Sequence, residues 1–310
     1  MRKNYLADSE RLNKAIYDFE TADEPLVGLT DPEYRAAFID QIIDSEQRVL
    51  YTDRLRQRTL DPSSVDPSSK AFHPLKAAII YSETGDFDEA VWLVFLFVHF
   101  GRHRLAGWRY IRDIYGQLGG QKHWTWEDVS NDVLAFRFWL DHNQAALRAA
   151  PGQHGFGNHR KYESLNAWDR TGTGEAIESY VEWVHAGGGE HRERFALALD
   201  QSPELGFDLL YKSLNDVTRF GRIARFDYLM MLKKLHLLDI VPPHSYLVGA
   251  SGPLLGARLL FTGDPATGGA REMQNALKTL GSAIDATPDV LEDAVCNWQK
   301  SPDRYFRFSA

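Results

Sequence analysis

The chain has 310 residues, of which 44% are hydrophobic and 12% aromatic, so it can form a sizeable core in one large domain or two modest ones. Its net charge of −8 argues against a generally basic nucleic-acid binder but allows a local basic face. The single cysteine, Cys296, excludes a disulfide framework, a four-thiolate zinc site and a cysteine-ligated iron–sulfur cluster within one chain, and fits a reducing cytosol.

The first part of the chain predicts two helices, of which the first is polar. Residues 1–20 are too polar for a signal peptide and have a helical pattern. Thr30-Asp31-Pro32 is typical of a helix start, because a capping residue precedes a proline, and this helix should run to about Arg58. A loop rich in proline and serine follows at 60–69. We therefore expect residues 1–71 to form an N-terminal helical segment.

The next part, residues 72–150, predicts a mostly buried helical bundle. Its four helices are expected at 73–83, 87–100, 103–118 and 125–150. Glycine-containing breaks separate them. The most apolar stretch, residues 90–100, is too short to span a bilayer, so we expect a buried core helix and no membrane association.

The last part, residues 151–310, should contain a helical hairpin and act as one catalytic unit with the bundle. Its expected elements are a glycine-rich loop at 151–158, helices at 159–168, 174–185 and up to 199, the hairpin at 203–238, a loop at 240–256, and helices at 254–261, 271–284 and 288–300. The only strand-like stretch is 245–248, so the predicted fold class is all-α, with two helical halves beside a cleft.

The hairpin carries a dense cluster of candidate functional groups. Arg219, Arg222 and Arg225 crowd its turn, and Gly221 is expected to supply the permissive backbone that a sharp reversal needs. The first amides of the second helix should point outward, and together with the arginines they predict a phosphate clamp. An ordinary hairpin with a solvated basic face is the alternative.

A second basic segment, Asn158-His159-Arg160-Lys161, follows the glycine-rich loop. Its amides and cations could hold a phosphate. Cations at a helix start oppose the helix dipole, and a polyanion nearby would explain them. The alternative is a solvated helix start. In a third basic group at 102–112, an amphipathic helix with Trp108 in the core is favoured over base stacking.

Acidic and histidine side chains give the candidate chemistry. Asp227 or Asp239, close to a sugar, could stabilise an oxocarbenium-like transition state and orient a water, whereas helix capping or a salt bridge is the alternative for each. Glu89 and His99 lie in an apolar run, so each needs a buried partner or a function. His99 and His103 are separated by a glycine and lack the H-E-x-x-H pattern, so we predict no metal site and no cofactor.

Several common enzyme motifs are missing from the sequence. It has no phosphate loop of the G-x-x-x-x-G-K-[ST] type, no G-x-S-x-G elbow and no G-x-G-x-x-G after a strand. A P-loop kinase, an α/β-hydrolase and a dinucleotide-dependent dehydrogenase are therefore not indicated.

The order of three features resembles the helix-hairpin-helix DNA glycosylases: GFGNHRKYESL at 155–165, then VTRFGRIARF, then Asp239. Arg219-Phe220-Gly221 match the end of the glycosylase hairpin, and Asp239 stands near the catalytic position, although the hairpin proline, its first glycine and the usual V-D-T-H context are absent. Bifunctional members have a Schiff-base lysine where this chain has Ile223. The resemblance thus implies a monofunctional enzyme that uses water.

A closer resemblance, over residues 72–261, is to the α-glutamyl/putrescinyl thymine pyrophosphorylase family, a glycosylase-like group tied to hypermodified phage DNA bases. It is carried by DEAVWLVFLFVHFG, NHRKYESL, FGRIARFDYL and YLVGASGPLLGARLLF. Some members of the wider group resemble anti-phage glycosylases that remove modified bases from phage DNA.

These observations lead to the hypothesis of a cytoplasmic, monofunctional DNA glycosylase in antiviral defence. It would flip a modified base out of double-stranded DNA and leave an abasic site. The hypothesis gives phosphate binding to residues 158–161, Arg219, Gly221 and Arg222, and a base pocket to Glu89, Trp92, Phe95, His99 and Trp108. The alternatives are a transferase that acts on pyrophosphorylated thymine and a non-catalytic DNA-binding module.

Overall fold

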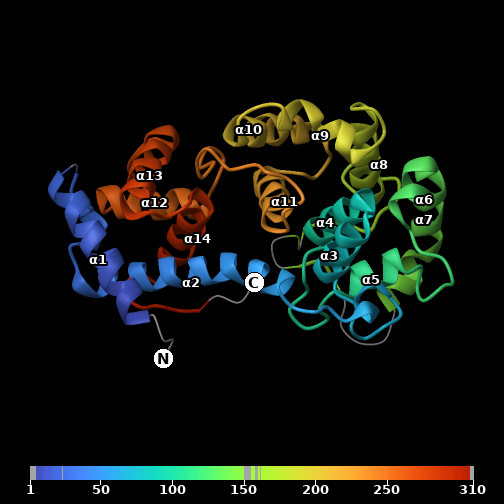
Figure 1. The fold of residues 1–310 in the computed structure, drawn as a ribbon, viewed down its shortest axis with the longest axis horizontal. Coiled ribbons are helices and arrows are strands. Elements are labelled where there is room, and N and C mark those ends of the chain that lie inside the picture. Colours follow the sequence, from blue (N-terminus) through green and yellow to red (C-terminus); the bar gives the residue numbers. More distant parts are fainter. Residues whose placement is uncertain (1–4, 23, 150–154, 158–159, 161, 308–310) are drawn as a thin grey trace. The chain divides into compact units, whose positions relative to one another are not determined.

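A computed structural model describes residues 5–22, 24–149, 155–157, 160 and 162–307. Across these residues the chain forms fourteen α-helices and no β-strand, apart from one isolated bridge between His103 and Gly107 (Figure 1). The all-α prediction is confirmed. None of the described helices is long and apolar enough to cross a membrane.

Contacts between residues group the chain into two compact units. The first unit combines the described residues up to 53 with residues 242–307, and the second contains the described residues between 54 and 241. Segments from the beginning and from the end of the chain therefore share one unit. The sequence-based division into residues 1–71, 72–150 and 151–310, with the last two as one catalytic unit, stays a prediction.

The first unit is built from helices of both chain ends. They are α1 (Tyr5–Ala22), the first part of α2 (Pro32–Arg56), α12 (Gly252–Thr262), α13 (Ala270–Ile284) and α14 (Pro288–Trp298). Trp298 is fully buried in their shared core, packs against Phe38 at 5.3 Å between ring centroids, and donates its indole hydrogen to Tyr34 O at 3.1 Å. This aromatic anchor joins the last helix to α2.

The second unit surrounds one apolar helix, α4 (Phe87–Phe100). Its other helices are α3 (Pro74–Thr84), α5 (Arg109–Tyr115), α6 (Trp126–Asn131), α7 (Val133–Ala149), α8 (Thr173–His185), α9 (His191–Leu199), α10 (Pro203–Ser213) and α11 (Arg222–Lys234). Apolar residues cover α4 on all sides, which predicts burial, and helices α3, α5, α6, α9 and α11 pack around it. Asp86 caps α4 through Glu89 N, and Gly101 ends it.

Two expected helices and the strand-like stretch differ in the structure. The helix expected from 103 is shorter, because His103 and Gly107 exchange two backbone hydrogen bonds and α5 begins only at Arg109. The helix expected at 125–150 is divided at Asp132, whose carboxylate caps the first turn of α7. The strand-like stretch 245–248 is irregular.

The helix expected at 159–168 is wrong for its described residues. Asn166 Oδ1 accepts hydrogen bonds from the amides of Trp168 and Asp169, both at 2.8 Å, and Asp169 Oδ1 accepts one from Thr171 N. Short polar side chains that bind neighbouring amides compete with helix formation in this way. The segment therefore reaches α8 as irregular backbone.

Candidate functional site

The predicted hairpin between α10 and α11 is confirmed. A single turn of 3-10 helix at Leu214–Asp216 follows α10, and the chain then reverses before α11. Phe220, which is only 4% exposed, packs its ring 5.2 Å from Phe95 and 5.7 Å from Tyr228. This buried ring anchors the turn in the second unit.

The backbone of the turn corrects one expectation. Gly221 has φ −64° and ψ −178°, which is extended backbone that any residue adopts, and a Cβ there would meet nothing within 4 Å. The left-handed residue is Arg219, with φ 64°. The predicted conformational reason for Gly221 is therefore wrong, because the strained position lies two residues earlier.

The first turn of α11 leaves backbone donors without partners. Gly221 occupies the N-cap position and has no side chain to cap the helix. Among the described residues, the amides of Gly221, Ile223 and Ala224 have no acceptor. Unpaired amides at the positive end of a helix dipole favour an anion.

The arginines of the turn have different surroundings. Arg219 donates from Nε to Glu163 Oε2 at 2.8 Å and from Nη2 to Glu163 Oε1 at 3.2 Å and Tyr162 O at 3.3 Å, and this carboxylate raises the pKa of Arg219. Arg225 donates to Tyr211 O at 3.4 Å, which links α11 to α10. Arg222 lies over the ring of Phe226 at 5.8 Å.

Asp227 lies in the second turn of α11 and is held by Arg160. Arg160 Nη2 donates to Asp227 Oδ2 at 3.2 Å, and Arg160 Nε donates to Val98 O at 2.8 Å. The Arg160 side chain is 9% exposed, whereas that of Asp227 is 47% exposed. A buried guanidinium thus fixes a half-exposed carboxylate near the hairpin turn. The neighbouring candidates Asn158, His159 and Lys161 lie outside the described residues.

Asp239 lies away from the turn. It is exposed and follows α11, whose 13 residues extend for about 20 Å. Two residues later, Val241 N donates to Pro203 O at 3.0 Å, which places this part of the chain beside the start of α10. Of the two candidate aspartates, Asp227 is the one near Gly221.

Three of the candidate base-pocket residues are buried around α4. Trp92 and Phe95 are 0% exposed, and Trp92 Nε1 donates to Trp124 O at 2.9 Å. Glu89 accepts hydrogen bonds from Tyr115 OH at 2.6 Å and Trp126 N at 2.7 Å, and burial raises its pKa to about 7. A base-binding role for these residues stays a prediction, and it would require this core to open.

The other two, His99 and Trp108, also lie against aromatic side chains. Thr173 OH donates to Ser164 O at 2.8 Å, so His99 Nε2 carries the hydrogen in its 3.0 Å bond to Thr173 Oγ1. Burial, with smaller effects of the charges of Arg160 and Arg219, lowers the pKa of His99 to about 3. Trp108 is partly buried, 5.0 Å from Phe97 between ring centroids. Their predicted pocket roles are not tested by these contacts.

Comparison with known protein families agrees with the resemblance in the sequence. The family model described as alpha-glutamyl/putrescinyl thymine pyrophosphorylase clade 3 matches residues 33–310. The chain belongs to this family. Neither a comparison with curated proteins nor one with solved structures finds a match.

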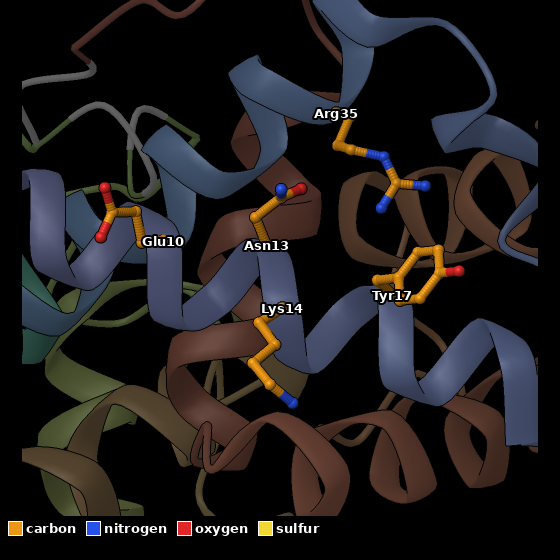
Figure 2. Close-up of a pocket in the computed structure, with 5 residues that line it drawn as sticks. All are labelled: Glu10, Asn13, Lys14, Tyr17 and Arg35. Carbon is orange, nitrogen blue, oxygen red and sulfur yellow. The ribbon is translucent and has the colours of Figure 1, made fainter.

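In this family member, two surface concavities lie in the first unit. One of about 530 Å³ is lined by Glu10, Asn13, Lys14 and Tyr17 of α1 and by Arg35 of α2 (Figure 2). Arg35 is bonded to Glu20 at 2.7 Å. The second concavity lies around α13 and the start of α14. Neither contains Asp227, and the expected cleft beside the hairpin stays a prediction.

A buried polar chain in the second unit was missed by sequence reasoning. His191 Nδ1 bonds Asp88 Oδ1 at 2.5 Å, Tyr180 OH bonds His191 Nε2 at 2.7 Å, and the hydroxyls of Tyr180 and Tyr228 are 2.8 Å apart. The only local signal is the polar Asp88 at the start of an apolar helix. No group of three potential metal ligands occurs among the residues described.

Proposed function

We propose that this family member is a monofunctional DNA N-glycosylase that removes a modified base from double-stranded DNA as part of phage defence. The observation that carries the proposal is that, at the turn, an arginine has the left-handed backbone that favours glycine, whereas the glycine has a backbone that any residue adopts. A left-handed backbone costs a non-glycine residue about 1 kcal/mol or more, yet Arg219 occupies that position. Gly221 occupies a position that requires no glycine. A ligand at the turn accounts for both residues.

The proposed ligand at the turn is the sugar–phosphate backbone. Without a Cβ, Gly221 allows a phosphate to approach the unpaired amides of the first turn of α11. Arg219 and Arg222 add positive charge beside these amides. Contacts of this kind position a protein on DNA without reading its sequence.

The proposed chemistry uses Asp227 as the carboxylate. When the flipped nucleotide reacts, its C1′–N bond breaks, water supplies a hydroxyl to C1′, and a proton ends on the departing base. Asp227 would stabilise the positive charge that develops on the sugar and orient the water. Its 47% exposure leaves it accessible, and Arg160 holds it in position.

Water is the proposed nucleophile because no lysine stands at the hairpin position that forms Schiff bases in bifunctional glycosylases. That position is Ile223, an exposed residue in the first turn of α11. The product would be a free base and an intact strand with an abasic site.

The family name favours a second candidate function. A pyrophosphorylase of a modified thymine, as the family description reads, needs a site for a diphosphate. The same amides and arginines at the turn could provide it. A hypermodified thymine in DNA is the natural substrate to test for both candidates.

The test is to incubate the protein with hypermodified and with unmodified duplex DNA and then treat both with alkali. We expect strand breaks only in the modified DNA, because abasic sites are cleaved by alkali. Altered nucleotides without breaks would favour the transferase and overturn the glycosylase. A gel shift with no chemical change would instead indicate a DNA-binding module.

A further inference from the structure

Two ion pairs, formed by Arg160 and Glu163, join the segment before α8 to the hairpin in opposite directions. Arg160 of the segment holds Asp227 of α11, whereas Glu163 of the segment holds Arg219 of the turn. Each side thus contributes one cation and one anion. The residues of the segment that contact the hairpin lie three positions apart, so both pairs depend on the same short stretch of chain.

Glu163 lies where an anionic ligand of Arg219 would bind. Its two oxygens receive hydrogen bonds from Nε and Nη2 of Arg219, at 2.8 Å and 3.2 Å. Carboxylate and phosphate oxygens both fit this two-donor geometry of a guanidinium. The nearby amides of Gly221 and Ile223 have no acceptor among the described residues, so the carboxylate satisfies only the arginine part of the anion site.

We propose that Glu163 is an internal substitute for a DNA phosphate. In the free protein it holds Arg219 in the left-handed conformation, and on DNA binding it leaves the guanidinium to a backbone phosphate. This inference rests on the proposed binding of DNA and is independent of base excision.

The partial exposure of Arg219 in its pair with Glu163 supports replacement of Glu163 by a phosphate, and not a permanent ion pair. The Arg219 side chain is 31% exposed, so solvent and ligands reach it, while that of Glu163 is 10% exposed. Because the guanidinium of Arg219 is partly exposed, solvent weakens the pair, and a phosphate that also binds several amides can compete with Glu163. The competing carboxylate should therefore lower the affinity for DNA by a measurable factor.

The experiment measures the affinity of a fluorescein-labelled duplex by fluorescence anisotropy at one fixed salt concentration. Glu163→Gln should bind roughly threefold to tenfold more tightly than the wild type, because the competing charge is removed. Glu20→Gln is the matched control, since it removes one charge from a similar arginine pair in the first unit. Its affinity should equal that of the wild type. Adding Arg219→Ala to Glu163→Gln should abolish the gain.

Equal or weaker binding by a folded Glu163→Gln protein would overturn the inference, because Glu163 would then be only an anchor. An equal gain in Glu20→Gln would overturn it as well, since net charge alone would explain the effect. Thermal unfolding checks the fold. If Glu163→Gln does not fold, Glu163→Asp provides the test, because its shorter side chain loosens the pair and should also tighten binding. Wild-type protein that binds DNA but releases no base would overturn the proposed chemistry without affecting this comparison of affinities.

Discussion

The second unit contains two polar regions that differ in how completely their groups are bonded. In the core, the Asp88–His191–Tyr180–Tyr228 chain links four helices, and its histidine and both tyrosines are 0% exposed. At the hairpin turn, amides of α11 have no acceptor among the described residues. The difference separates polar groups that stabilise the fold from polar groups that remain available to a ligand.

The hydrogen bonds of the core side chains all point in one direction, from Tyr228 through Tyr180 and His191 to Asp88. Burial lowers the pKa of His191 despite the nearby Asp88, so the imidazole is neutral and donates only from Nδ1. Its Nε2 then accepts from Tyr180 OH, and Tyr180 in turn accepts from Tyr228 OH. Each donor has an acceptor, which is the condition under which a buried polar network stabilises a protein.

The largest expected effect comes from removing the proposed catalytic charge next to the turn. Asp227→Asn should lower the rate of base release by about 100- to 10,000-fold, because the sugar cation loses its counter-charge. DNA binding should be retained, since Arg160 can still donate to the amide oxygen. Single-turnover release of the modified base and a gel shift measure the two quantities.

Asp239→Asn is the matched control for this prediction. It makes the same change in an exposed aspartate at the other end of α11. Its rate should stay within a fewfold of the wild type. A loss of activity in Asp239→Asn with full activity in Asp227→Asn would assign the chemistry to the distant aspartate.

The next largest effect should occur in the core. Tyr180→Phe keeps the ring but removes the hydroxyl that His191 and Tyr228 share. Two fully buried groups then lack partners, so the free energy of unfolding should fall by about 2 kcal/mol in urea titrations. Tyr17→Phe, at a residue 63% exposed, should change it by less than about 0.5 kcal/mol. Unchanged stability of Tyr180→Phe would show that the hydrogen bonds of Tyr180 to His191 and Tyr228 do not stabilise the fold.

A pH-dependent effect is expected at His99, which is buried in α4. The folded protein lowers its pKa from 6.5 to about 3, mainly through burial. Its neutral form therefore contributes stability above pH 6.5 that is lost as the pH falls toward 3. Relative to His99→Gln, the wild type should lose up to about 1.4 kcal/mol of unfolding free energy per pH unit in this window. A pH-independent difference between the two proteins would contradict the burial of a neutral histidine.

The helices and the hairpin could be predicted because their signals are local. The helix start at Thr30-Asp31-Pro32 and the apolar pattern of α4 depend on a few neighbouring residues. The helix expected at 159–168 failed for an equally local reason, since Asn166 and Asp169 bind the amides that a helix would use.

The arrangement of the candidate site could not be predicted in the same way. Arg160 and Asp227 are 67 residues apart in sequence, so no local pattern indicates their ion pair. Gly221 correctly indicates where the chain turns, but the sequence does not show that the residue with a left-handed backbone is Arg219. The order of the chain makes Asp239 a candidate beside Asp227, whereas the length of α11 and the contact between Val241 and Pro203 place Asp239 away from the turn.

The smallest expected effect tests the open amides directly. Gly221→Ser puts a hydroxyl at an N-cap whose backbone already suits one, so it should stabilise the fold by about 0.5–1 kcal/mol. The same hydroxyl occupies the amides of the first turn, and its Cβ blocks close approach. DNA affinity should therefore fall by about threefold to tenfold, measured by anisotropy beside urea unfolding.

Gly269→Ser provides the comparison, because Gly269 is also an N-cap glycine with extended backbone and no side chain to cap its helix, at the start of α13 in the first unit; its own amide donates to Glu272 Oε2 at 3.1 Å. It should gain similar stability and keep its DNA affinity. If both variants become more stable and both bind DNA as the wild type does, the first turn of α11 is an ordinary helix end. Opposite changes in stability and affinity at Gly221 alone would mean that this position sacrifices stability of the fold to bind a ligand.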